Sequence, residues 1–236
     1  MLTHLIELRR RALYVITFFM GLFLLFCFYA PTLFHQMILP LLQVLPTKNP
    51  LIATQITTPV FIPMKLSADV ACLFTAPFTL LQLWYFVAPA LYRKERKGLR
   101  LAIFASLALF CLGGLFCYDV MIPLMLHFFA QAVPLGVRFM PDITYAIDFM
   151  TRMILLFGFC FQIPLVCLLL VSLNLVTIKT LKIIRPYVIV GAFILGMLLT
   201  PDVCSQMMLA IPLCLLFELG IVLSALVVRG ARQIAI

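Results

Sequence analysis

Two acidic residues lie inside strongly basic clusters, and their carboxylates are well suited to binding a positively charged group. Glu7 precedes three consecutive arginines, and Glu95 lies within the run RKERK. One interpretation is that each acid forms a salt bridge with a neighbouring basic residue. The alternative is a pair of carboxylates that accept bidentate hydrogen bonds from the guanidinium groups of an incoming ligand. The local sequence leaves both interpretations open.

Two polar residues lie within long apolar stretches. Gln162 follows FGFCF and stands beside Pro164, and Glu218 lies within LLFELGIV. Polar groups in hydrocarbon are costly unless they face protein or water. Each of these side chains either hydrogen-bonds to a neighbouring helix and holds a bundle together, or offers a contact to a partner, a substrate or a proton. Pro164 leaves an unpaired backbone group beside Gln162, which favours the functional interpretation there.

Patterns typical of metal sites and active sites are missing from the sequence. The eight cysteines form no CxxC pair, and His4, His35 and His127 are dispersed. No HExxH, GxSxG or phosphate-binding glycine loop is present. We therefore expect no metal, no cofactor and no enzymatic activity, and we interpret the cysteines as small apolar side chains that fill space between helices.

The composition identifies the class of protein. The chain has 236 residues, of which 65% are hydrophobic and only 11% are charged. Soluble domains carry about a quarter charged residues, and disordered chains are still more polar, so both classes are excluded. The apolar runs do not alternate with polar residues as the strands of a membrane β-barrel do. The sequence predicts an all-α, polytopic membrane protein formed as one integral membrane domain.

Long stretches without charge predict six membrane-spanning helices. We expect the helices at residues 12–30, 69–91, 101–121, 150–172, 186–200 and 204–226, with the fifth and sixth short. Prolines at 40, 46, 50, 59 and 63 predict an outer loop over 31–68 that includes one short helical piece at the interface. The other outer segments are 122–149 and 201–203, and the inner loops are 92–100 and 173–185.

The distribution of basic residues predicts the orientation. With six spans, both termini lie on the same side as the loops 92–100 and 173–185, and these regions hold most of the 17 lysines and arginines. The remaining basic residues are Lys48, Lys65, Arg138 and Arg152. Positive charge collects on the cytoplasmic side, so both termini are expected there, facing anionic lipid headgroups. Three arginines before a full-length span argue against a cleavable signal peptide.

Several separate segments resemble one known family. The segments HLIELRRRAL, LWYFVAPALYRKERK and LLTPDVCSQMMLAIPLCLLFELGI are similar to the TatC family, as are IATQITTPVFIPMKL and RPYVIVGAFILGMLLT. TatC is the receptor subunit of the twin-arginine (Sec-independent) protein translocase. The resemblance implies a cup-like bundle of six helices in the bacterial cytoplasmic (inner) membrane, with both termini in the cytoplasm. It also implies binding of the twin-arginine signal peptides of folded precursors, self-association, recruitment of TatA-type and TatB-type single-span subunits, and transport driven by the proton-motive force.

The resemblance also assigns roles to individual positions. The implied signal-peptide residues are Glu7, Arg9, Phe86, Pro89, Tyr92 and Glu95. Pro46, Lys65 and Asp202 match positions in the outer loops, and Glu218 matches a position that helps to dock a single-span partner. The apolar part of the signal would pass near Gln162. Many members of the family have glutamate at that position, and an amide neither binds a proton nor carries charge.

Two other functions remain as alternatives. A small-solute or ion transporter could line a path with Glu218, Asp119 and Gln162, but the sequence shows no internal repeat of the kind that many transporters have. An intramembrane enzyme would need a nucleophile and base or a set of metal ligands, which the sequence does not supply.

Overall fold

Helices make up almost all of the part of the chain that the structure describes. The computed structural model describes residues 2–44, 52, 58–91, 96–134, 140–173, 175–200 and 202–234. Within this part, six helical stretches are long and apolar enough to cross a membrane: Arg9–Phe28, Phe61–Trp84, Leu101–Gln131, Ile143–Ser172, Ile178–Leu199 and Val203–Val227. The predicted all-α fold with six spans is confirmed.

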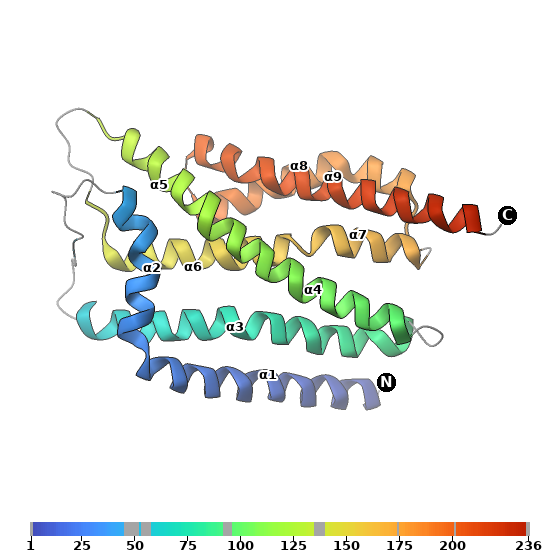
Figure 1. Cartoon of the computed structure of the whole chain (residues 1–236), viewed down its shortest axis with the longest axis horizontal. Coiled ribbons are helices and arrows are strands. Elements are labelled where there is room, and N and C mark those ends of the chain that lie inside the picture. Colours follow the sequence, from blue (N-terminus) through green and yellow to red (C-terminus); the bar gives the residue numbers. More distant parts are fainter. Residues whose placement is uncertain are drawn as a thin grey trace. The chain divides into compact units, whose positions relative to one another are not determined.

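The helices belong to two compact units. Unit 1 comprises Met1–Lys94 and Leu115–Leu155, and unit 2 comprises Glu95–Gly114 and Leu156–Ile236. The bounds are α1 (Leu2–Phe28), α2 (Ala30–Val44), α3 (Thr58–Leu91), α4 (Arg96–Phe116), the π-helical turn η1 (Cys117–Met121), α5 (Ile122–Gln131), α6 (Ile143–Cys160), α7 (Ile163–Ser172), α8 (Ile178–Leu199) and α9 (Val203–Ile234) (Figure 1). The chain passes from unit 1 to unit 2 between Lys94 and Glu95, returns to unit 1 within α4, and enters unit 2 again within α6.

In unit 1, α1 and α3 lie side by side and run antiparallel (Figure 1). The rings of Phe18 and Phe78 stack with their centroids 4.4 Å apart. Further along, the Ser67 hydroxyl donates a hydrogen bond of 3.1 Å to the backbone carbonyl of Phe26. Aromatic contacts and small polar side chains are typical of helix pairs in lipid, where the hydrophobic effect does not drive helices together.

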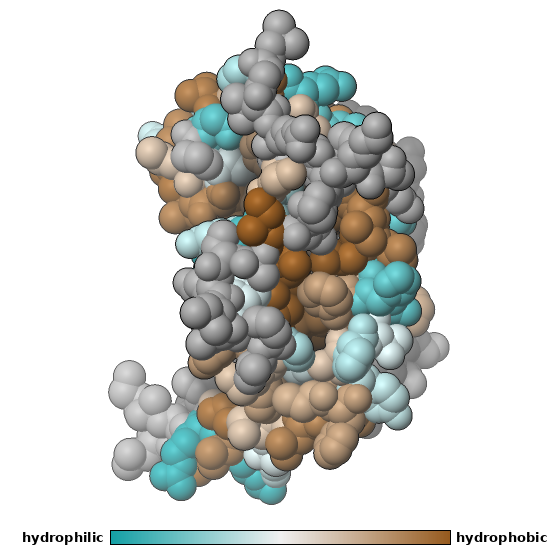
Figure 2. Space-filling view, turned by 90° about the vertical axis from the view of Figure 1, so that its left-hand side faces the viewer, coloured by the Kyte–Doolittle hydropathy of each residue, from teal (hydrophilic) through white to brown (hydrophobic). Residues whose placement is uncertain are grey.

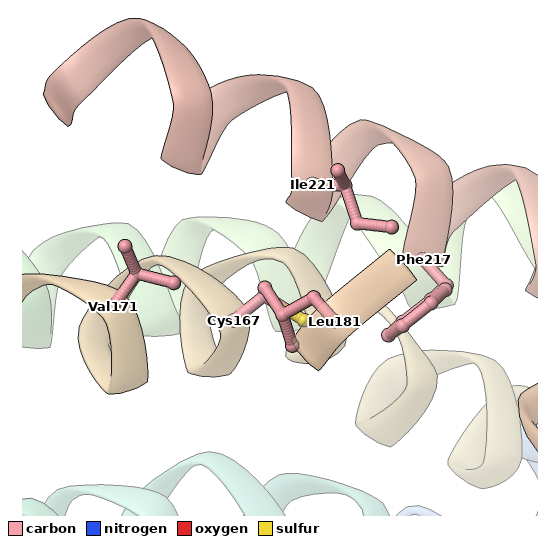
Figure 3. Close-up of a cluster of buried hydrophobic side chains, with 5 residues drawn as sticks. All are labelled: Cys167, Val171, Leu181, Phe217 and Ile221. Carbon is pink, nitrogen blue, oxygen red and sulfur yellow. The ribbon is translucent and has the colours of Figure 1, made fainter. Parts of the chain in front are cut away.

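In unit 2, α9 packs against both α7 and α8. Cys167 and Val171 of α7, Leu181 of α8, and Phe217 and Ile221 of α9 form one buried cluster (Figure 3). Gly220 allows the close approach, because a Cβ added there would lie 3.0 Å from the Cα of Pro164. Glycine at a helix crossing lets two backbones approach more closely than any side chain would allow.

A second close crossing in unit 2 joins α4 to the end of α6. A Cβ at Gly113 would lie 2.7 Å from the backbone oxygen of Phe157, and one at Gly158 would lie 2.7 Å from the Phe110 ring. Phe110 and Phe159 meet edge to face with their centroids 5.7 Å apart. The helices therefore touch through backbone and aromatic rings.

Several helix bounds differ from those expected, and prolines explain the differences at the second and third helices. The second helix begins at Thr58 rather than 69, because Pro59 lies in the first turn, where a missing N–H does no harm. The third span continues through Pro123 to Gln131, since the wider turn η1 immediately precedes that proline. The fourth begins at Ile143 rather than 150.

The fifth helix also begins earlier than expected. α8 starts at Ile178 and includes Pro186, so it has 22 residues. The side chain of Thr177 accepts a hydrogen bond from the backbone N–H of Thr180 and caps the helix. A threonine directly before an apolar helix is a capping signal that could have located this start in the sequence. The sixth helix, α9, has 32 residues, so it is not short as expected, although its apolar span Val203–Val227 lies close to the expected range of 204–226.

Large apolar side chains cover much of the outside of the helices. Phe28, Phe104, Ile183 and Leu198 are each at least 70% exposed. Brown apolar residues at the surface are visible in the space-filling view (Figure 2). A surface of this kind suits contact with lipid and would not be stable in water.

Candidate functional site

The candidate site begins with Glu7, near the start of α1. Its side chain is 43% exposed, whereas the side chain of Arg11, one turn further along, is 20% exposed. Nε of Arg11 donates a hydrogen bond of 3.2 Å to Oε1 of Glu7, and Nη2 donates another to the same oxygen. Among the residues that the structure describes, none hydrogen-bonds to Oε2. The acid is therefore paired on one side and open on the other.

Arg11 also links α1 to α3. Its Nη1 donates to the backbone carbonyl of Gln82 at 3.2 Å and approaches the side-chain oxygen of Gln82 at 3.5 Å. The arginine thus holds the start of α1 beside the last third of α3. A local salt bridge of Glu7 was one of the two interpretations left open by the sequence, but the contact of Arg11 with Gln82, 71 positions further along, has no local pattern that would reveal it.

The other two arginines of this cluster behave differently from Arg11. Arg10 donates from Nε to the Tyr14 hydroxyl at 2.8 Å, and its guanidinium lies 5.6 Å from the centre of the Tyr14 ring. Arg9 is exposed. Only Arg11 of the three contacts Glu7 in the part of the chain described.

An apolar pocket lies next to the Glu7–Arg11 pair. It has a volume of about 300 Å³ and is lined by residues of α1 and α3: Arg11, Ala12, Val15, Ile16, Thr79, Gln82 and Leu83. The arginine that holds Glu7 therefore also lines a recess of mostly aliphatic side chains. Such an arrangement fits a ligand that presents a cationic group next to an apolar one.

The remaining residues predicted for this site are described only in part. Phe86 and Pro89 belong to the last turns of α3, where Phe86 follows Gln82 by one helical turn. Their side chains lie outside what the structure describes. Tyr92, Glu95 and Pro46 lie outside the described residues altogether. The predicted pairing of Glu7 with Glu95 therefore remains a prediction.

Gln162 lies in the turn between α6 and α7 and is 8% exposed. The Ser106 hydroxyl of α4 donates to its side-chain oxygen at 2.8 Å, and its side-chain nitrogen donates to the backbone carbonyl of Ser106 at 2.8 Å. Both ends of the amide are satisfied within unit 2. The contact favours the interpretation in which Gln162 holds two helices together.

Glu218 of α9 is paired with Arg185 of α8. The distance from Nη2 of Arg185 to Oε2 of Glu218 is 2.7 Å, and the two side chains are 42% and 45% exposed. This ion pair supports the interpretation of Glu218 as a link between neighbouring helices. Partner docking by Glu218 remains a prediction.

Lys65 lies in α3, not in the outer loop where it was expected. Its Nζ is 3.2 Å from Oδ1 of Asp148, and Arg152 approaches the other oxygen of the same carboxylate at 2.8 Å. Asp148 and Arg152 both belong to α6, so Lys65 ties α3 to α6 inside unit 1. Structural pairing accounts for all three charges.

Asp202 lies in the turn between α8 and α9, as expected, and caps α9. Its Oδ2 accepts hydrogen bonds from the Ser205 hydroxyl at 2.6 Å and from the Ser205 backbone N–H at 2.8 Å. The hydrogen bond from the Ser205 side chain holds the pKa of the Asp202 carboxyl below its ordinary value of 3.8; burial opposes this shift, and the hydrogen bond from the Ser205 backbone adds to it.

Comparison with known proteins gives one consistent result. The family model described as "Sec-independent protein translocase protein (TatC)" matches residues 3–212. A TatC of Haemophilus influenzae is 43% identical over 95% of this chain and 88% of its own length. A TatC of Escherichia coli K12 is 40% identical over 99% of this chain and 91% of its own length.

The fold points to the same group of proteins. A crystal structure described as the twin-arginine translocase receptor TatC matches with a TM-score of 0.85 and 34% identity. The match covers 94% of this chain and 98% of that one. At this level of identity and coverage, the likeness extends beyond a shared helical architecture.

Proposed function

Because the chain belongs to the TatC family of Sec-independent protein translocase proteins, we propose that Glu7 accepts one arginine of a twin-arginine signal peptide. Family membership makes the chain a subunit of the twin-arginine translocase, a multi-pass membrane protein that serves transport and is not an enzyme. It also removes the case for a small-solute transporter.

One observation carries the proposal about Glu7. Its carboxylate is held at Oε1 by Arg11, which lines the apolar pocket between α1 and α3, and no described residue hydrogen-bonds to Oε2. A guanidinium that reaches Oε2 forms a charge-assisted hydrogen bond, which is about twice as strong as a neutral one. An apolar side chain next to that arginine enters the pocket. The contacts of Arg11 with Glu7 and with Gln82 hold the acid in a fixed position relative to the pocket.

The wider role follows from the same membership. Glu95 receives the second arginine, and Arg9, Phe86, Pro89 and Tyr92 complete the binding patch. Signal binding on the cytoplasmic face of the inner membrane recruits TatA-type and TatB-type subunits, with Glu218 among the docking contacts. The proton-motive force drives transport. The path of the signal near Gln162 and the periplasmic role of Pro46 belong to this proposal as predictions.

Binding of a synthetic twin-arginine signal peptide to the purified protein tests the role of Glu7. We expect Glu7→Gln to weaken binding about tenfold or more, since hydrogen bonds to charged groups contribute about 1.5–3 kcal/mol. Fluorescence anisotropy with a labelled peptide measures the change, and a peptide with two lysines in place of the arginines provides the reference for non-specific attraction. Equal affinity of wild type and E7Q for the arginine peptide, with unchanged thermal unfolding, would rule out Glu7 as the acceptor.

A further inference from the structure

The free ends of the α8–α9 hairpin carry a second group of charges. α8 and α9 run antiparallel and are joined by a turn near Asp202. The two helices pack closely there, since a Cβ on Gly196 would lie 3.3 Å from the Cα of Gln206. Lys182 lies 18 residues before Thr200, which corresponds to about 27 Å along a helix that rises 1.5 Å per residue. The hydrocarbon core is about 30 Å thick, so Lys182 lies at the opposite membrane boundary from the turn.

Arg185 and Glu218 lie close to the same boundary. Glu218 is 16 residues after Asp202, about 24 Å from the turn. Tyr187, which is 74% exposed, follows Arg185 by two positions on α8. It lies in the middle of α8, about two and a half turns from Ile178, so its own position does not mark the helix end. The backbone at these charges lies just inside the boundary, and the long side chains of Lys182 and Arg185 can extend from there to the level of the lipid phosphates.

A pocket of about 290 Å³ opens at this level. It is lined by three charged residues, Lys182, Arg185 and Glu218, and by four apolar residues, Ile221, Val222, Ala225 and Leu226. Ile221 also belongs to the buried cluster of unit 2 (Figure 3), so one wall of the pocket is fixed by the core. The volume is near the lower limit for small-molecule sites and suits a headgroup rather than whole acyl chains.

The charges of the pocket favour an anion. Glu218 neutralises Arg185 through the contact of 2.7 Å, and Lys182, which is exposed, leaves an excess positive charge. Nε of Arg185 is enclosed and has no hydrogen-bond partner among the described residues. A cationic pocket with an apolar wall at the membrane boundary matches a molecule with a negative head and an apolar tail.

We infer that this pocket binds the phosphate and glycerol of an anionic phospholipid, with Lys182 and Arg185 facing the phosphate. The acyl chains leave the pocket and lie along exposed apolar side chains of α8 and α9, such as Ile189 and Leu215. Glu218 weakens the site by occupying part of Arg185, so the affinity is moderate and depends on the lipid charge. The inference does not depend on how signal peptides bind.

Native mass spectrometry of the purified protein tests this inference. The protein in neutral detergent is mixed with phosphatidylglycerol or with phosphatidylcholine, and the fraction that retains lipid is counted. We expect Lys182→Gln to lower phosphatidylglycerol retention about fivefold, because one basic residue near an anionic lipid contributes about 1 kcal/mol. Lys179→Gln is the matched control: it removes the same charge from the same helix but does not line the pocket.

A second variant separates the site from general attraction. Glu218→Gln removes the competing carboxylate, so we expect it to raise the ratio of bound phosphatidylglycerol to bound phosphatidylcholine. Equal effects of K182Q and K179Q would overturn the inference, as would equal retention of the two lipids by the wild type. An unchanged or lower ratio in E218Q would contradict it as well. Thermal unfolding of each variant identifies any that fail to fold.

Discussion

At the scale of single residues, Arg11 shares the carboxylate that we propose as the acceptor of a signal arginine. An incoming cation must bind Glu7 in the presence of a guanidinium that already donates two hydrogen bonds to Oε1. The planar guanidinium of a ligand arginine can still donate a directed hydrogen bond to Oε2 of Glu7. The ammonium of a lysine is a compact charge that lacks this fixed geometry. The resident arginine therefore favours arginine over lysine in the ligand.

Substitution of Arg11 should reduce this selectivity. We expect Arg11→Gln to narrow the affinity ratio between an arginine-pair peptide and a lysine-pair peptide about two- to fivefold, the range of an exposed ion pair. Parallel titrations with the two peptides measure the ratio. Arg10→Gln is the control, since Arg10 has the same charge but contacts Tyr14. Identical ratios in R10Q and R11Q would mean that only the overall charge matters.

At the scale of elements, the crossing of α4 with α6 depends on the absence of a side chain. Gly113→Ala would place a Cβ 2.7 Å from a backbone oxygen that cannot rotate away. We expect this change to lower the free energy of unfolding by about 1–3 kcal/mol, as overpacked cores do. Thermal unfolding in detergent measures the effect.

Gly21 provides the matched control for this crossing. A Cβ at Gly21 would meet nothing within 4 Å, so Gly21→Ala should be neutral or slightly stabilising through its higher helix propensity. If G113A and G21A unfolded at the same temperature, close backbone packing would not be what holds the crossing.

The start of α9 should respond to acid through Asp202. The native pKa of this carboxyl is below the ordinary value of 3.8, so its contribution to stability is complete above 3.8 and is lost as the pH falls through the native pKa. We expect Asp202→Asn to keep the capping hydrogen bonds but to lose this dependence, so that wild type and variant diverge only above the acid range. Unfolding temperatures measured from neutral to acidic pH make the comparison.

Asp202→Ala separates capping from charge. This variant should be about 1 kcal/mol less stable than D202N at every pH, because it removes the cap altogether. Wild type and D202N with the same acid dependence would show that the Asp202 charge does not contribute.

The sequence predicted the elements better than their ends and their partners. Apolar runs located the six spans, because length and hydropathy are local properties. The prolines led to wrong helix ends, because the energetic cost of a proline in a helix depends on its position. Three of them lie within helices or in their first turn: Pro59, Pro123 and Pro186. The spacing of Glu7 and Arg11 made their salt bridge foreseeable. Ser106, which pairs with Gln162 across 56 positions, carries no charge and no local pattern that would reveal it.

At the scale of the whole molecule, the even number of spans requires both termini to lie on one side of the membrane. The basic residues near the termini predict the cytoplasm as that side. Alkaline phosphatase is active only in the periplasm, so a fusion after Pro134 should be active and one after Leu173 should be inactive. The reverse pattern would contradict the proposed orientation while leaving the six spans intact.

The amide pair between Gln162 and Ser106 has a consequence for how the membrane voltage acts on the protein. Moving one elementary charge across the whole bilayer changes its energy by about 2.3 kcal/mol per 100 mV of membrane potential. Gln162 is neutral, and so is its partner, so an energised membrane exerts no net pull on this helix contact. The membrane potential acts instead on the charged residues at the helix ends. We therefore expect the contact between Gln162 and Ser106 not to depend on the membrane potential.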